Sequence, residues 1–325
     1  VRPELTMDLS TLALIATVSA PYGVPVDGYP SYEERVLLLW TNAVRVDPEA
    51  FEDEYESGDE PCSFDDFEAS EQEAKDPMYI DLDLTEVARV HSTDMAENGC
   101  FQHESCDGTD TWTRIAEYYD DTTNLGENIA MGTDDPYYAV TGMWMCSSGH
   151  RANIMNGDYN EMGPGIDGIY LTQDFAVGSL EQGDPPVRMA VDDDGLVWAD
   201  WGDSDGPKVL EVVTGGIPTA MELTYGAEDR GVYSVEPEVG DDPNWYVYWE
   251  TASGAKGTFP EEGSFSPDGE WVDEQAQRGG LFGDVPEDEL DEAMIEDLRI
   301  VGCSTSGGSV SAMAVIAGVL AARRR

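Results

Sequence analysis

The stretch that decides the fold runs from Gly99 to Asn156 and contains three segments: Cys100-Phe-Gln-His103-Glu-Ser-Cys106-Asp-Gly108, Gly126-Glu127-Asn128-Ile-Ala130 and Trp144-Met-Cys146-Ser-Ser-Gly149-His150-Arg151-Ala-Asn153-Ile154. It holds two of the three histidines of the chain and three of its five cysteines. The third histidine, His91, lies just upstream. A chain that uses so few imidazoles and places them together has concentrated its chemistry there. We therefore predict that the functional site lies in this stretch.

The charge of the chain excludes two classes of partner. Its 325 residues include 68 acidic and 16 basic side chains, which gives a net charge of −52. Such a field repels nucleic acid and anionic lipid, so neither is an expected partner. The acidic residues are spread over the whole chain, which favours a solvated acidic surface suited to salty surroundings over a cation store. With 41% hydrophobic residues, the chain has enough apolar material for packed cores.

Both ends of the chain have the composition of targeting segments. Residues 1–20 contain an apolar run that ends in Val18-Ser19-Ala20, a pattern typical of a secretory signal peptide. Residues 283–302 are an acidic linker. Residues 303–325 contain Cys303, an apolar run and three terminal arginines. This tail resembles the MYXO-CTERM sorting signal of surface proteins. The resemblance implies processing near Cys303 by a sorting machinery and a membrane anchor at the cell surface.

Export permits disulfide bonds, and the cysteines form an even set once Cys303 is assigned to the tail. Four cysteines allow three pairings, of which we favour Cys100–Cys106, closing a small loop around His103, and Cys62–Cys146. A zinc site built on the thiols is the alternative, but the sequence lacks a paired Cys-x-x-Cys knuckle.

The first half of the chain shows helix signals followed by strand signals. Ser31-Tyr-Glu-Glu34 is a capping box that opens a helix ending before Pro48, and residues 50–80 are predicted to be irregular. A second helix begins at Asp83, ends at Gly99 and carries His91 on its buried face. Further helices are expected over 111–119 and 135–144, and strands over 163–177. The order predicts a mixed α/β layer arrangement.

From residue 184 the pattern changes to short alternating runs. These runs cover 187–191, 196–201, 209–213, 221–225, 232–235 and 245–249, with Asp-Gly and Gly-Gly turns between them. They predict a small immunoglobulin-like β-sandwich domain over 184–282. In the last run, alternating aromatic residues favour a half-buried strand over a sugar-binding face. The acidic turns 192–195 and 203–206 favour plain turns over calcium sites, since neither has EF-hand spacing.

Several motifs of the first half occur in the order of a bacterial CAP domain, of the SCP/PR-1 (cysteine-rich secretory protein) superfamily. They are His91-Ser92-x-x-Met95, His103, Asp107-Gly108, Arg114, Gly126-Glu127-Asn128-Ile-Ala130, Trp144, Gly149-His150-Arg151-Ala-Asn153-Ile154 and Tyr170-x-Thr172-Gln173-x-Phe175. The resemblance runs from about residue 32 to 178, within a domain placed at 31–180. It implies an α-β-α sandwich with a surface cleft.

In the eukaryotic branch of this family the cleft carries two His and two Glu, and some members bind zinc there. The resemblance assigns the first His to His103 and one Glu to Glu127. The second Glu has no clear match, and His150 lies in the corresponding segment. Tyr170 stands where the second His would be, so the set of four is incomplete.

These residues leave three functions open. One is a purely structural protein of the cell envelope, and the other two are as follows. The first is a secreted, surface-anchored protein that binds a peptide, a glycan or a lipid of the cell envelope in a His/Glu cleft, without established catalysis. Its cleft would be lined by His91, Asn128, Arg151, Asn153, Tyr170 and Gln173. The second is a hydrolase in which His103, Glu127 and His150 hold a divalent metal such as zinc, or in which Glu127 orients a histidine that acts as general base. No other cofactor is implied.

Overall fold

The structure, a computed structural model, describes residues 21–58, 60–120, 123–178, 185–238, 240 and 242–273. These residues fall in one compact unit. The predicted signal peptide, acidic linker and sorting tail, with Cys303, lie outside the described residues. Within the described ranges, no helix is both long and apolar enough to cross a membrane.

The α/β part contains two long helices, α1 (Tyr32–Val46) and α3 (Leu82–Asn98). The capping box at the start of α1 is confirmed, since the Ser31 side chain accepts from the Glu34 amide and the Glu34 side chain accepts from the Ser31 amide. The shorter helical segments are η1 (Pro48–Phe51), α2 (Glu52–Ser57), η2 (Phe64–Asp66), α4 (Thr111–Ile115), α5 (Pro136–Tyr138), the π-helix η3 (Ala139–Trp144) and α6 (Ser148–Ile154).

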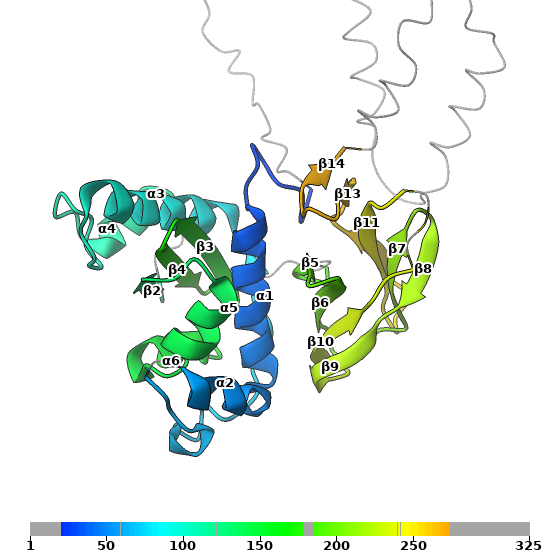
Figure 1. Ribbon diagram of the computed structural model, residues 1–325, viewed down its shortest axis with the longest axis horizontal. Coiled ribbons are helices and arrows are strands. Elements are labelled where there is room, and N and C mark those ends of the chain that lie inside the picture. The colour runs from blue at the N-terminus through cyan, green and yellow to red at the C-terminus, as the bar shows by residue number, and fades with distance from the viewer. Residues whose placement is uncertain are drawn as a thin grey trace, which may run out of the picture. The chain divides into compact units, whose positions relative to one another are not determined.

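A four-stranded sheet lies between the long helices (Figure 1). Its strands are β1 (Tyr79–Ile80), β2 (Gly126–Met131), β3 (Glu161–Asp167) and β4 (Tyr170–Ala176), in the order β1-β3-β4-β2. On one face, Gln173 of β4 donates to Thr41 of α1 at 2.7 Å. On the other face, the Thr172 hydroxyl lies 2.9 Å from the Ser92 hydroxyl of α3. The predicted α-β-α layers are confirmed.

Several local predictions differ from the structure. Helix α3 is capped by Asp81, whose carboxylate accepts from the Leu84 amide, rather than opened by Asp83. The stretch 50–80 is not wholly irregular, since it contains α2, η2 and β1. Strand β2 and helix α6 had no separate prediction. These elements are short, so contacts with the rest of the domain decide them more than local propensity does.

Strand β3 packs against α3 at backbone contact distance. A Cβ atom at Gly163 would overlap the Leu84 backbone, and one at Gly165 would overlap the Ala88 backbone. Both neighbours are main chain of a helix, which cannot give way by changing rotamer. Only glycine therefore allows this helix and sheet to approach so closely.

We expect Gly165→Ala to lower the free energy of unfolding by about 3 kcal/mol or more, because the added methyl group must push β3 away from α3. Urea denaturation followed by circular dichroism measures the change. The matched control is Gly149→Ala in α6, where a Cβ would meet nothing within 4 Å. That variant should be neutral or stabilised by about 0.5–1 kcal/mol. Equal stabilities of the two variants would contradict the packing argument.

The second part of the chain is the predicted β-sandwich. One sheet has the order β5-β6-β10-β9, built from β5 (Ala190–Asp193), β6 (Leu196–Gly202), β9 (Glu222–Ala227) and β10 (Arg230–Val235). The other contains β7 (Val209–Thr214), β8 (Ile217–Ala220), β11 (Trp245–Glu250), β12 (Lys256–Phe259), β13 (Ser264–Phe265) and β14 (Trp271–Val272). Each of the six predicted runs overlaps one strand, whereas β8 and β12 to β14 were not predicted. Trp245, Val247 and Trp249 are buried, as the half-buried strand interpretation requires.

Helix α1 is shared between the two parts. One flank covers the β1-β3-β4-β2 sheet and another contacts β5, β6, β9 and β10 (Figure 1). The Trp40 ring lies 5.2 Å from that of Trp198, measured between centroids, and the Tyr32 hydroxyl donates to the Asp192 carbonyl at 2.7 Å. Every residue of α1 from Glu34 to Val46 is buried. The two parts therefore share a continuous hydrophobic core.

A buried carboxylate lies in this shared core. Asp200 of β6 accepts from Asn42 of α1 at 2.6 Å and from the Arg188 and Met189 amides at 2.7 and 2.8 Å. Burial raises the pKa of Asp200 from 3.8 to about 6, although these hydrogen bonds oppose the rise. The folded protein therefore takes up a proton at a higher pH than the unfolded chain does.

The sign of the pH dependence follows from this pKa. Between about pH 6 and pH 4 the folded state holds the proton on Asp200 and the unfolded state does not, so the Asp200 contribution raises the free energy of unfolding as the pH falls. The whole effect is about 3 kcal/mol. We expect Asp200→Asn to flatten the dependence of the urea midpoint on pH relative to the unsubstituted chain. Parallel profiles would contradict this assignment.

Candidate functional site

Glu127 of β2 is the centre of the predicted site, and it is a buried charge. Only 1% of its side chain is exposed. Its Oε1 accepts from His103 Nδ1 at 2.7 Å, and its Oε2 accepts from Arg114 Nη2. A buried carboxylate needs such partners, because removing it from water without them is costly. The structure therefore brings Glu127 and His103 together, as the sequence predicted.

Arg114 ties Glu127 to the loop that carries His103. Its side chain is 4% exposed. Its Nη1 donates to the His103 carbonyl at 3.0 Å and to the Ser105 hydroxyl at 3.2 Å, while Nη2 bonds Glu127. The Thr111 hydroxyl donates to the same His103 carbonyl at 2.7 Å. Thr111 and Arg114 of α4 thus hold the backbone carbonyl of His103, and Glu127 of β2 holds its imidazole.

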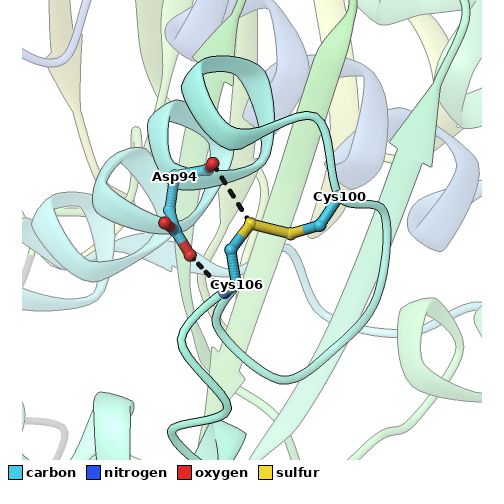
Figure 2. A group of neighbouring side chains, drawn as sticks. All are labelled: Asp94, Cys100 and Cys106. Atoms are coloured by element: carbon cyan, nitrogen blue, oxygen red, sulfur yellow. Dashed lines mark hydrogen bonds between the residues drawn. A yellow bond between two sulfur atoms is a disulfide. The ribbon is translucent and has the colours of Figure 1, made fainter.

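The disulfide loop around His103 is also hydrogen-bonded to α3. Both predicted disulfides, Cys100–Cys106 and Cys62–Cys146, are present. Figure 2 shows Asp94 of α3 beside the first of them, with its carboxylate accepting from the Cys106 amide at 2.6 Å. The group formed by Asp94, Cys100 and Cys106 has the proximity of a metal site. Its thiols are consumed by the disulfide, so they offer no thiolate ligand and the zinc alternative for them does not fit.

His103 is the histidine of the site that meets solvent, with 51% of its side chain exposed. The hydrogen bond to Glu127 is the main cause that raises the pKa of His103 above 6.5, and burial opposes it. Since Nδ1 donates to Glu127, the ring presents Nε2, which has no hydrogen-bond partner among the described residues. His103 is therefore an oriented imidazole that carries positive charge more readily than a free histidine.

His91 and Asp174 lie behind Glu127. His91 is fully buried, and its Nε2 lies 3.1 Å from the Gln102 carbonyl and 3.9 Å from Glu127 Oε2. Burial lowers the pKa of His91, so it is neutral, and Nδ1 has no partner in the described part of the chain. The prediction that His91 lies on the buried helix face is confirmed.

Asp174 forms a pair of buried carboxyl groups with Glu127, since the two residues are cross-strand partners in β2 and β4. Asp174 is fully buried, and neither of its carboxyl oxygens has a hydrogen-bond donor among the described residues. Burial first, and then the charge of Glu127, raise the pKa of Asp174 well above 3.8. In this pair the proton is therefore favoured on Asp174, and Glu127 carries the charge that Arg114 and His103 compensate.

His150 is near His103 but is not a partner of Glu127 in the described residues. Burial lowers the pKa of His150, and the charge of His103 lowers it further. A divalent ion held by His103, Glu127 and His150 does not fit this donor set. Both Glu127 oxygens already accept hydrogen bonds, and the Arg114 guanidinium brings positive charge to the carboxylate that would bind the ion.

Four of the residues predicted to line the cleft are used inside the protein. Asn128 donates to Gln173 at 3.1 Å, and Gln173 donates to Thr41. Asn153 donates to Asn128 at 2.9 Å. Arg151 donates to Glu71 at 2.7 Å and lies 4.0 Å from the centre of the Phe67 ring. These side chains therefore stabilise the elements that carry the site through hydrogen bonds within the protein.

Tyr170, the remaining residue predicted for the cleft, begins β4 opposite Met131, four residues before Asp174. At about 3.3 Å per strand residue, it lies roughly 13 Å along the strand from the position of Glu127. Tyr170 and Glu127 are therefore at different ends of this strand pair.

Two members of the site had no predicted role. Arg114 is part of the quoted motif pattern, but a lone arginine gave no indication of its partner. Asp174 occupies an unspecified position between Gln173 and Phe175. The alternation along β4 is the signal that identifies it, because Leu171 and Phe175 share one face and Thr172 and Asp174 share the other. An acidic residue on the buried second face indicates a paired or neutral carboxyl group.

A family model covers the part of the chain in which this site lies. Residues 41–175 match the CAP model, described as the cysteine-rich secretory protein family. The resemblance that the motifs predicted over 32–178 is thereby confirmed for the CAP part. The resemblance of the tail to a sorting signal falls outside the described residues.

Two similar proteins come from Bacillus subtilis. The chain is 42% identical over 95 residues to the uncharacterized membrane protein YlbC of Bacillus subtilis (strain 168), and 35% identical over 101 residues to the uncharacterized protein YkwD of the same strain. These matches cover 29% and 30% of this chain and 27% and 39% of the relatives, so the chain matches less than half of each relative.

A solved extracellular protein containing a SCP domain from Bacillus anthracis str. Ames is 31% identical, with a TM-score of 0.31 and coverage of 32% of this chain and 35% of that one. The family model matches residues 41–175, and the β-sandwich from residue 190 to 272 lies outside this match.

Proposed function

We propose that the CAP-like part is an exported ligand-binding module that recognises its ligand through the exposed imidazole of His103. The ligand is a peptide, a glycan or a lipid of the cell envelope, and the chain is displayed at the cell surface through residues 303–325. His150 adds a second, neutral imidazole to the recognition surface.

One observation carries this proposal. His103 is half-exposed and oriented, whereas the charged groups behind it satisfy one another inside the protein. An oriented ring with an available Nε2 is a pre-organised hydrogen-bonding group, and it loses little conformational freedom on binding. Glu127 and Arg114 support that ring and do not themselves meet the ligand. The proposal does not extend to metal-assisted hydrolysis, because Arg114 forms an ion pair with Glu127, the carboxylate that would have to bind the metal.

Binding to three probes tests the proposal: soluble peptidoglycan fragments, a mixed octapeptide library and phosphatidylcholine vesicles. We expect the full chain to bind one of them and His103→Ala to weaken that binding at least tenfold, with a smaller loss for His150→Ala. Glu97→Gln, an exposed change on α3, is the matched control and should bind normally. Equal binding by His103→Ala, or no binding to any probe, overturns the proposal.

A further inference from the structure

A second site of unusual chemistry lies where the β-sandwich meets the segment before β1, and His103 is not among its lining residues. A pocket of about 360 Å³ opens where β6 and β10 approach the segment before β1. It is lined by two arginines, Arg188 and Arg230, and by the acidic residues Asp76, Asp203 and Asp229, with Gly202 and Ser204 between them. The CAP family match ends before most of these residues.

Arg188 is a buried cation with few hydrogen-bond partners, although the charge of the buried Asp200 carboxylate acts on it. It is 8% exposed, and its guanidinium lies 4.3 Å from the centre of the Tyr79 ring. On the side of Gly202, an added Cβ would come within 2.8 Å of Nη2. The guanidinium plane is thus held between an aromatic ring and a glycine, which fixes the direction of its N–H groups.

The hydrogen bonds of this guanidinium are incomplete. Of its five N–H donors, the described residues satisfy one, through a 3.3 Å bond from Nη2 to the Gly202 carbonyl, and Nε is buried without a partner. Arg45, which is also buried, donates instead to four backbone carbonyls. A buried charged donor without an acceptor lowers the stability of the folded state. A ligand that accepts hydrogen bonds from Arg188 would remove this cost.

The rim of the pocket limits the charge of that acceptor. Arg230 forms an ion pair with Asp76 at 3.2 Å, and Asp203 accepts from the Ser204 amide at 2.6 Å. With Asp229 these groups leave the rim acidic, so a multiply charged anion would be repelled. A planar carboxylate carries one charge and matches the fork of a guanidinium.

We propose that this pocket binds the carboxylate group of a small monoanionic ligand, which accepts hydrogen bonds from the Arg188 guanidinium with Arg230 at the mouth. The site is independent of the function proposed for His103. It gives the β-sandwich a binding role in addition to its packing against α1.

Titration of the isotopically labelled full chain with sodium acetate tests the site, with sodium chloride and inorganic phosphate as comparison salts at equal ionic strength. We expect the backbone amide resonances of Gly202 and Ser204 to shift saturably with acetate, with a dissociation constant of about 1–10 mM. Chloride should leave them unshifted, and phosphate should bind at least tenfold more weakly. Arg188→Gln should weaken acetate binding at least tenfold.

Lys208→Gln is the matched control, because Lys208 is an exposed cation of the same β-sandwich that pairs with Glu250. It should change acetate binding less than twofold. If Arg188→Gln does not fold, Arg230→Gln replaces it, since the Arg230 side chain is partly exposed, and binding should weaken about threefold. Shifts that chloride reproduces, tighter binding of phosphate than of acetate, or unchanged binding in the arginine variant would each overturn the proposal.

Discussion

A chain that contains residues 21–178 without the β-sandwich is expected not to unfold cooperatively. Helix α1 is buried along its whole length from Glu34 to Val46, and the β-sandwich supplies part of that cover. Removing it exposes Trp40, which contacts Trp198, and Phe51, whose ring lies 4.8 Å from that of Tyr225. Each such side chain contributes about 1.5–3 kcal/mol by burial.

Polar groups add to this loss. Asn42 would lose Asp200, and Tyr32 would lose the Asp192 carbonyl. Arg35 would lose the Gly269 carbonyl and the ring of Phe265, which lies 4.4 Å from its guanidinium carbon. The sum approaches the 5–15 kcal/mol that stabilises a typical domain as a whole. The short fragment should therefore show weak near-ultraviolet circular dichroism and no sharp urea transition.

The control for truncation is a chain of residues 21–273, which should unfold in one sharp transition. Adding a separate 185–273 fragment to the 21–178 fragment should restore part of the near-ultraviolet signal, since the lost contacts are non-covalent. A 21–178 fragment with the same urea midpoint as the longer chain would show that the two parts are independent domains. This experiment also tests the boundaries predicted from the sequence, 31–180 and 184–282.

The sequence predicts the α/β part and the β-sandwich better than it predicts the contact between them, which α1 makes. Alternation and turn residues identify β3 and β4 and six of the ten strands of the β-sandwich, and the capping box identifies α1. The uniform burial of α1 is visible only in the structure. Its polar residues Arg35, Asn42 and Arg45 have the composition of an exposed face, yet all three are buried by partners distant in the sequence.

The candidate site shows the same limit. His103 and Glu127 come together as the motif order predicts, and the disulfide loop around His103 is also confirmed. The role of Arg114 depends on its contact with Glu127, 13 residues further along the chain. The role of Asp174 depends on Glu127 as its cross-strand partner. Because both oxygens of Glu127 accept hydrogen bonds from Arg114 and His103, Glu127 orients the His103 ring instead of acting as the predicted metal ligand.

The variant Glu127→Gln is expected to cost about 3–5 kcal/mol of stability and to lower the pKa of His103. The buried Arg114 loses its counter-charge, and breaking such a pair leaves an uncompensated charge in the core. The hydrogen bond to Glu127 is the main cause that raises the pKa of His103, so an amide in its place removes most of the rise. Urea denaturation and the imidazole resonance of His103 followed against pH measure the two effects.

Asp174 makes this prediction specific. When Glu127 is neutral, the charge that disfavours ionisation of Asp174 is gone, and ionisation of Asp174 beside Arg114 can then offset part, but not all, of the lost counter-charge. Asp174→Asn alone should therefore change stability by less than about 1 kcal/mol, since it replaces a neutral carboxyl group. The double variant Glu127→Gln with Asp174→Asn should lose more stability than the two single losses added together.

Glu71→Gln is the matched control for Glu127→Gln, because Glu71 forms a buried ion pair with Arg151 in the same part of the chain. It should lower stability but leave the pKa of His103 unchanged, since its pair does not touch the imidazole. An unchanged His103 pKa in Glu127→Gln would mean that Glu127 does not orient or charge the exposed ring. Simple additivity in the double variant would mean that the two carboxyl groups titrate independently, and Asp174 would then be only a packing residue.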